Sequence, residues 1–137
     1  MNRITTALLA ALLLASGATA CSSGDDEAKG CATALTERTG GNPGDKPTVE
    51  EAKARVDAFD KTLAGMTRSG YQSVASDAFD AMADKAKEGG ETRPEACKPL
   101  SEDDYTVLQM AKVIDGLGWI GKDGQFDKLK MVQGLGN

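Results

Sequence analysis

The sequence contains no histidine, and this absence excludes several kinds of active site at once. Histidine is the common base of nucleophilic triads, a frequent zinc ligand and the side chain that most readily exchanges protons near neutral pH. Without it, no cysteine of the chain has a histidine partner that would activate its thiolate. The acidic residues fall on predicted polar helix faces, caps or loops rather than in apolar surroundings. We therefore expect no catalytic residue, no metal site and no cofactor, and a protein that is not an enzyme.

Aromatic side chains and long hydrophobic runs are also scarce. Phenylalanine, tyrosine and tryptophan make up 4% of the chain, with a single tryptophan, so the predicted core is modest. The main apolar stretch, residues 4–14, is well short of the roughly 20 residues that span a bilayer. The chain has 16 basic and 21 acidic residues. This balance argues against nucleic acid as a partner, because nucleic-acid binding requires clustered positive charge.

The beginning of the chain has the three regions of a secretory signal peptide. A basic start, Met1-Asn2-Arg3, precedes the apolar residues 4–14, and small residues follow over 15–20. A signal peptidase would cut such a segment after Ala20. The sequence therefore predicts an exported protein, with residues 1–20 as its signal peptide.

The cleavage region Ala18-Thr19-Ala20-Cys21 resembles the lipobox of bacterial lipoprotein precursors. That resemblance implies a diacylglycerol in thioether linkage on Cys21, which becomes the first residue after cleavage. The protein would then be anchored by its N-terminal lipid to the outer face of the cell membrane, or to the outer membrane of a diderm host. The alternative is an ordinary small-residue cleavage site and a freely secreted protein.

The three cysteines, Cys21, Cys31 and Cys97, are an odd number for an exported protein. If Cys21 carries lipid, Cys31 and Cys97 remain as a pair in an oxidising compartment. We therefore predict a Cys31–Cys97 disulfide, with two buried free thiols as the alternative. Residues 21–29 are mostly small and acidic and are expected to form a flexible tether, which leaves residues 30–137 as the folded domain.

Apolar residues that recur every three or four positions predict an all-α domain, a small bundle of three main helices plus one or two short ones. A short helix is expected over about 27–38. The main helices are expected over about 48–66, 69–88 and 101–116, and a last short helix over 125–133. Thr48, Ser69, Ser101 and Asp123 are the expected N-caps.

The third main helix is apolar over most of its circumference, which places it at the centre of the bundle. The apolar faces of the other helices are expected to point inward. These faces include Tyr71 and Phe79 of the second main helix, and Phe126, Leu129 and Val132 at the last helix.

Two sequence patterns match binding motifs, but we interpret both as ordinary structural features. The run Gly116-Leu117-Gly118-Trp119-Ile120-Gly121 matches a dinucleotide-binding loop, but a predicted helix precedes it where that loop requires a strand. We interpret it as a helix C-cap followed by a glycine-rich turn. Asp77, Asp80 and Asp84 share one helix face, which we interpret as a solvated acidic face rather than a cation site.

Trp119 and Ile120 are the candidate contact residues. We interpret Trp119 as a plug at one end of the core, and the alternative is an exposed aromatic anchor for a partner. The preferred function is a non-catalytic cell-envelope module that binds an envelope protein or the cell wall. The alternatives are a small-ligand-binding lipoprotein and a carboxylate-based cell-wall hydrolase. The segment 116–121 separates the first two: exposure favours a partner surface, whereas a place in a cavity wall favours a ligand.

Overall fold

The computed structural model describes residues 19–136, with side chains from residue 24 onward. The predicted signal peptide, residues 1–20, lies almost wholly outside the described residues, and so does the side chain of Cys21. The described chain forms five α-helices and one short 3-10 helix, and its only strand-like pairing is an isolated bridge between Ile120 and Phe126. The all-α prediction is therefore confirmed. No helix within residues 19–136 is long and apolar enough to cross a bilayer.

The first helix, α1, spans Thr19–Thr39 and is longer than predicted. The expected flexible tether over 21–29 is wrong, because the helix runs through this segment. Ala28 is fully buried, and it continues the apolar stripe of Cys31, Ala32 and Leu35 one turn toward the N-terminus. Burial of this stripe outweighs the low helix propensity of the acidic, glycine-containing start.

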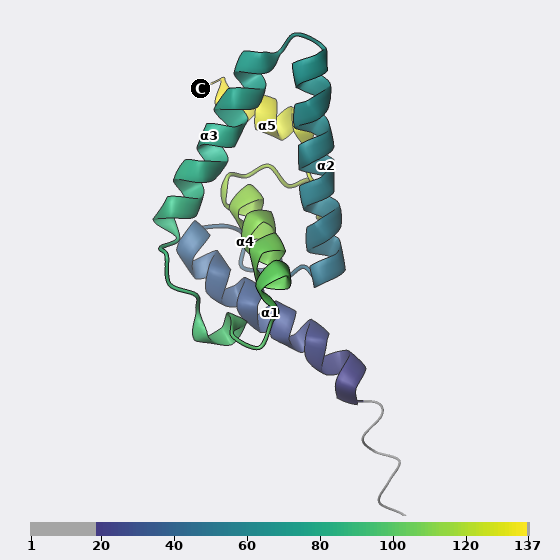
Figure 1. The fold of residues 1–137 in the computed structure, drawn as a ribbon, viewed down its shortest axis with the longest axis vertical. Coiled ribbons are helices and arrows are strands. Elements are labelled where there is room, and N and C mark those ends of the chain that lie inside the picture. The colour runs from purple at the N-terminus through teal and green to yellow at the C-terminus, as the bar shows by residue number, and fades with distance from the viewer. Residues whose placement is uncertain (1–18, 137) are drawn as a thin grey trace, which may run out of the picture.

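The next two helices form an antiparallel hairpin, with α2 over Val49–Arg68 and α3 over Gln72–Glu88 (Figure 1). The capping box predicted at Thr48 is confirmed, because its hydroxyl accepts from the Glu51 N–H while the Glu51 carboxylate accepts from the Thr48 N–H. The cap predicted at Ser69 is wrong. The Ser69 N–H instead donates to carbonyls in the last turn of α2, and Tyr71 takes the cap position of α3 without a side-chain hydrogen bond.

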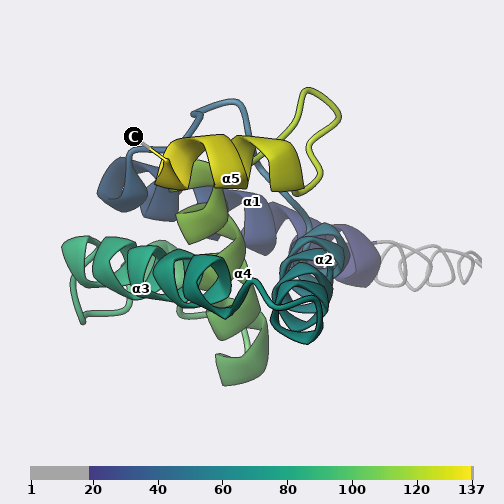
Figure 2. The same cartoon turned by 90° about the horizontal axis from the view of Figure 1, so that it is seen from above.

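After a 3-10 helix, η1 (Glu95–Cys97), the chain enters α4 (Glu102–Gly116) and finally α5 (Lys128–Leu135). The predicted Ser101 cap is confirmed, since its hydroxyl accepts from the Asp104 N–H. Helix α4 contacts α1, α2 and α3, so its predicted central place is confirmed as well. Figure 2 shows it passing between these helices. Helix α5 contacts α3 and lies across the end of the α2–α3 hairpin (Figure 1).

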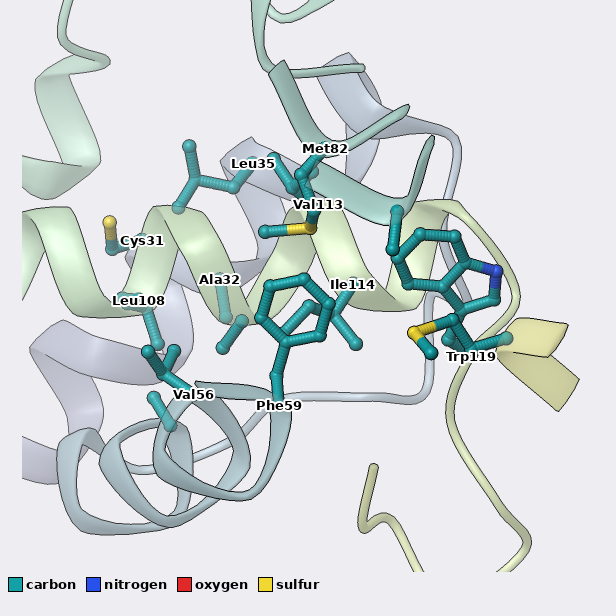
Figure 3. Packing of buried hydrophobic residues seen from close by; sticks show 14 of the residues in the cluster. Cys31, Ala32, Leu35, Val56, Phe59, Met82, Leu108, Val113, Ile114 and Trp119 are labelled. Carbon is teal, nitrogen blue, oxygen red and sulfur yellow. The ribbon is translucent and has the colours of Figure 1, made fainter. Parts of the chain in front are cut away.

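The core is built around α4 and the few aromatic residues. Phe59 of α2 lies beside Ile114 in Figure 3, and its ring stacks with that of Trp119 at a centroid distance of 6.1 Å. The ring of Phe126 meets Phe59 edge-on, at 5.5 Å and 80°. Trp119 is only 2% exposed, so it plugs one end of the core, and an exposed partner surface centred on this side chain is excluded.

The predicted disulfide joins Cys31 of α1 to Cys97 of η1, and both side chains are fully buried. The two Cα atoms lie 4.5 Å apart, and the bond closes a loop with a sequence separation of 66 residues. In the loop-entropy account, a crosslink of this span stabilises the fold by about 4 kcal/mol. It ties the connection between α3 and α4 to the first helix.

The inward faces predicted for α3 and α5 are partly wrong. Tyr71 and Phe79 are 61% and 64% exposed, because α3 packs through a narrow stripe of Ala75, Ala78 and Met82. In α5, Asp127 rather than Asp123 is the N-cap, and the helix begins at Lys128. Phe126 therefore precedes the helix, and the inward face is set by Met131. Leu129 and Val132 are left 65% and 41% exposed.

Candidate functional site

A cleft of about 690 Å3 opens where the loop that follows α1 meets the loop that follows α4. The ends of the two helices pack closely beside it, since a Cβ atom added at Gly116 would lie 2.5 Å from the Thr39 carbonyl oxygen. Half of the lining residues are glycines: Gly40, Gly41 and Gly44 in the first loop, Gly116 at the end of α4, and Gly118, Gly121 and Gly124 in the second loop. Much of the cleft wall is consequently bare backbone.

The second of these loops begins with the predicted C-cap. The Trp119 N–H donates to the Ile114 carbonyl, and the Gly118 N–H donates to the Asp115 carbonyl. Gly118 has a φ of +77°, a left-handed conformation that glycine adopts without strain. The interpretation of 116–121 as a helix end followed by a glycine-rich turn is therefore confirmed. The turn sends the Trp119 side chain into the core and leaves Ile120 half-buried in the cleft wall.

Four charged residues form a buried ion cluster beneath the cleft: Asp45, Arg55, Lys112 and Asp115. The Arg55 guanidinium donates to both carboxylate oxygens of Asp45, at 2.8 and 2.9 Å. It also donates to the Gly124 carbonyl at 2.7 Å, which ties α2 to both loops of the cleft. Arg55 is 2% exposed, and its Nε has no partner among the described residues, so its position is fixed through the Nη atoms.

The ammonium group of Lys112 is the most deeply buried charge of the cluster, with no exposed side-chain surface. Its Nζ donates to the Asp115 carboxylate at 2.6 Å, to the Asp45 carboxylate at 3.1 Å and to the Asp45 carbonyl at 2.7 Å. These three acceptors use all three protons of the ammonium group. Lys112 therefore holds the loop after α1 against α4.

Asp115 is almost completely buried, but only one of its oxygens is occupied by the protein. Its Oδ2 accepts from Lys112 and from the Asn42 N–H, the latter at 2.9 Å. A Cβ atom at Gly41 would clash with this oxygen, so only glycine allows the loop to approach so closely. The other oxygen, Oδ1, has no partner among residues 19–136 and retains some exposure. Asp115 is one of the residues that line the cleft.

The Asp45 carboxyl is held in its ionised form. Burial by itself would raise its pKa, but the hydrogen bonds and positive charges of Arg55 and Lys112 outweigh burial and leave the pKa below its ordinary value of 3.8. A lowered pKa in the folded state means that the ionised group stabilises the fold above about pH 4. This contribution is lost as the pH falls through the lowered pKa.

Sequence reasoning singled out Ile120 and the 116–121 segment without deciding between a partner surface and a cavity wall, and it missed the buried ion cluster. One signal was available: Lys112 and Asp115 lie three residues apart in a helix that is otherwise apolar over most of its circumference. Their partner Asp45 was not foreseeable, because it lies in a loop 67 residues before Lys112.

Asp77, Asp80 and Asp84 are exposed on α3, and the described part of the chain contains no acid, cysteine or histidine cluster suited to a metal. Those three acids do not line the cleft.

Replacing Lys112 should test whether the cluster supports the fold. Lys112→Met removes the cation between two carboxylates, and we expect the free energy of unfolding to fall by about 3 kcal/mol. Lys53→Met is the matched control, because Lys53 also pairs with an aspartate, Asp104 at 3.5 Å, but is largely exposed. Its loss should cost less than about 1 kcal/mol. Urea unfolding followed by circular dichroism measures both, and equal effects of the two substitutions would contradict a structural role for the buried cluster.

Comparisons of the chain with known protein families, with curated proteins and with solved structures found no match. The function is therefore argued from the geometry of the cleft.

Proposed function

We propose that the chain is an exported, lipid-anchored protein whose helical domain binds a small polar ligand in the glycine-rich cleft. The observation that carries the proposal is the Asp115 carboxylate. Its side chain is 6% exposed, yet one oxygen stays without a partner among the described residues at the wall of the cleft. This oxygen keeps some exposure to solvent, and a ligand hydroxyl, amide or amine proton would replace water as its hydrogen-bond donor.

The size and surface of the cleft suit such a ligand. Its volume of about 690 Å3 lies within the range of roughly 300–1,000 Å3 typical of small-molecule sites. The seven glycines let a ligand approach backbone N–H and C=O groups closely. Lys122, Asp123 and Lys130 stand at its edge and add charges of both signs. No aromatic side chain lines the cleft, so recognition would depend on hydrogen bonds rather than on stacking.

The position of the 116–121 segment favours binding of a small ligand over the protein-partner surface that the sequence suggested for this segment. Gly116, Gly118, Ile120 and Gly121 line the cleft, and Trp119 points into the core. Of the three large apolar residues in this segment, Trp119 is buried and Leu117 and Ile120 are partly buried, so none is fully exposed to a protein partner. An acid-catalysed hydrolysis gains no support either, because Asp45 and Asp115 are both bound to Lys112 and the lowered pKa of Asp45 keeps it ionised.

The anchor would hold the domain close to the membrane. Cys21 lies within α1 as the structure describes it, so a lipid on this residue would be attached directly to the helix. Thr19 and Ala20 would be removed by cleavage. With two acyl chains the attachment would be stable, and the orientation of the domain would follow that of α1.

The lipid anchor is tested by the intact mass of the mature protein. We expect a chain that begins at Cys21 and carries a diacylglyceryl group, and that sediments with membranes. Cys21→Ser should abolish both the added mass and the membrane association, while Cys31 and Cys97 stay oxidised. A mature chain without added mass that is released into the medium would show that the anchor does not exist.

The cleft is tested with a variant that fills it. Gly44 lines the cleft, and a Cβ atom there meets only the Asn42 side-chain oxygen, at 3.4 Å, so Gly44→Leu should fold normally. Gly30→Leu is the matched control, because Gly30 is exposed on α1, away from the cleft, with open space around its Cα.

A library of small polar fragments is then screened by NMR against the wild type and both variants. Binding in the cleft should shift the amide resonances of Gly41, Gly118 and Gly121 together, because these residues come from both of the loops that line the cleft. Gly44→Leu should abolish the shifts and Gly30→Leu should preserve them. A library in which no fragment moves these resonances, or shifts that survive Gly44→Leu, would rule out the cleft as the binding site.

A further inference from the structure

A second hollow, which we call the distal groove, lies between the α2–α3 turn and α5. It consists of two adjoining depressions of about 360 and 280 Å3 that share Met66, Tyr71 and Lys128. Val74 and Val132 line the larger one, and its wall is mostly apolar. The groove has no lining residue in common with the glycine-rich cleft. Whatever binds in it is therefore independent of the proposed ligand.

Two of the four exposed large apolar side chains among residues 24–136 line this groove, and a third follows one of its lining residues in the chain. Tyr71 and Val132 line it with 61% and 41% of their surface exposed, and Leu129 stands next to Lys128 with 65% exposed. Only one other large apolar residue of residues 24–136 is as exposed, Phe79, and it does not line the groove. Clustered exposure of this kind marks an interaction surface more often than scattered single residues do.

The charge of the distal groove is opposite to that of the chain. Its only charged lining residues are Lys61 and Lys128, and no carboxylate lines it. Neither lysine forms an ion pair with any described residue. The whole chain carries 21 acidic and 16 basic residues, so it is acidic, whereas the groove has only basic charged residues. A complementary occupant would carry apolar side chains together with negative charge.

We propose that the distal groove binds an acidic amphipathic helix of a partner protein. The apolar side of such a helix would cover Tyr71, Val74 and Val132, and its carboxylates would reach Lys61 and Lys128. Laying a helix into a hydrophobic groove is a common mode of peptide recognition, with apolar anchors spaced three, four and seven residues apart. The acidic flanks would set the direction in which the helix lies.

A second copy of this chain fits the groove poorly. A two-fold symmetric contact would place the same surface on both sides, and Lys61 and Lys128 would face their own counterparts without an acid between them. Like charges facing each other across an interface oppose association.

The chain's own membrane is also a poor occupant. In Figure 1 the α2–α3 turn and α5 lie at the opposite end of the long axis from the start of α1. If Cys21 carries lipid, as proposed above, the groove therefore points away from the membrane and toward other envelope proteins. This last step rests on the proposed anchor, whereas the groove itself does not.

The experiment uses the Cys21→Ser chain as bait for a displayed library of short random peptides. We expect the enriched peptides to be rich in Asp and Glu and to carry apolar residues at helical spacing. One enriched peptide is then synthesised, together with a copy in which every acid is replaced by lysine. Fluorescence anisotropy should show binding of the acidic peptide and none of the basic copy.

Two matched pairs of variants locate the contact. Tyr71→Ser should weaken binding by about tenfold or more, as expected for an aromatic anchor, and Phe79→Ser should not change it, although both remove an equally exposed ring. Lys128→Glu should weaken binding by a similar factor, and Lys29→Glu, on the exposed surface of α1, should not. Circular dichroism confirms that each variant keeps its helices.

Three results would overturn the proposal. The library could yield no enriched peptide, or the enriched peptides could lack an acidic bias. Tyr71→Ser and Phe79→Ser could also weaken peptide binding equally. Binding of anionic lipid vesicles that Tyr71→Ser abolishes would assign the groove to a membrane instead. Self-association that Tyr71→Ser abolishes would assign it to a second copy. None of these results bears on the glycine-rich cleft, whose test uses different residues.

Discussion

A buried ammonium group, that of Lys112, holds together parts of the chain that are distant in the sequence. It bonds to Asp45 in the loop after α1 and to Asp115 at the end of its own helix, α4. Arg55 of α2 completes the arrangement by binding Asp45 and the Gly124 carbonyl. Buried charges are costly unless each has its partners, so the four residues favour one arrangement of the two loops. The cleft between those loops takes its shape from this arrangement.

The molecule consequently has three regions with different chemistry. The start of α1, where Cys21 lies, is at one end of the long axis, and the distal groove between the α2–α3 turn and α5 is at the other (Figure 1). The start of α1 would carry the proposed lipid. The distal groove is mostly apolar, with two lysines among its lining residues. The glycine-rich cleft is polar, and a buried carboxylate lies in its wall. A small ligand and a protein partner could therefore be bound at the same time.

The sequence predicted what depends on neighbours along the chain. Apolar spacing and the caps at Thr48 and Ser101 placed α2 and α4, and the glycines after residue 115 predicted the end of α4. What it missed depends on contacts across the fold. The length of α1 follows from burial of Ala28, and the inward face of α5 follows from Met131, because Phe126 is drawn to Phe59 before the helix starts. The buried ion cluster and the cleft require loops that only the folded chain brings together.

Hydrogen exchange at single amides tests most directly whether Lys112 fixes the cleft. The Asn42 N–H is the reporter, because it donates to Asp115 Oδ2, the oxygen that Lys112 also binds. In the Lys112→Met protein we predict that the Asn42 amide loses its protection from exchange. Amides in the middle of α4 should stay protected, and their protection should fall only by the amount that the lower free energy of unfolding explains. In the Lys53→Met protein Asn42 should stay protected. Unchanged protection of Asn42 in the Lys112→Met protein would contradict the claim that the buried ammonium group holds the cleft.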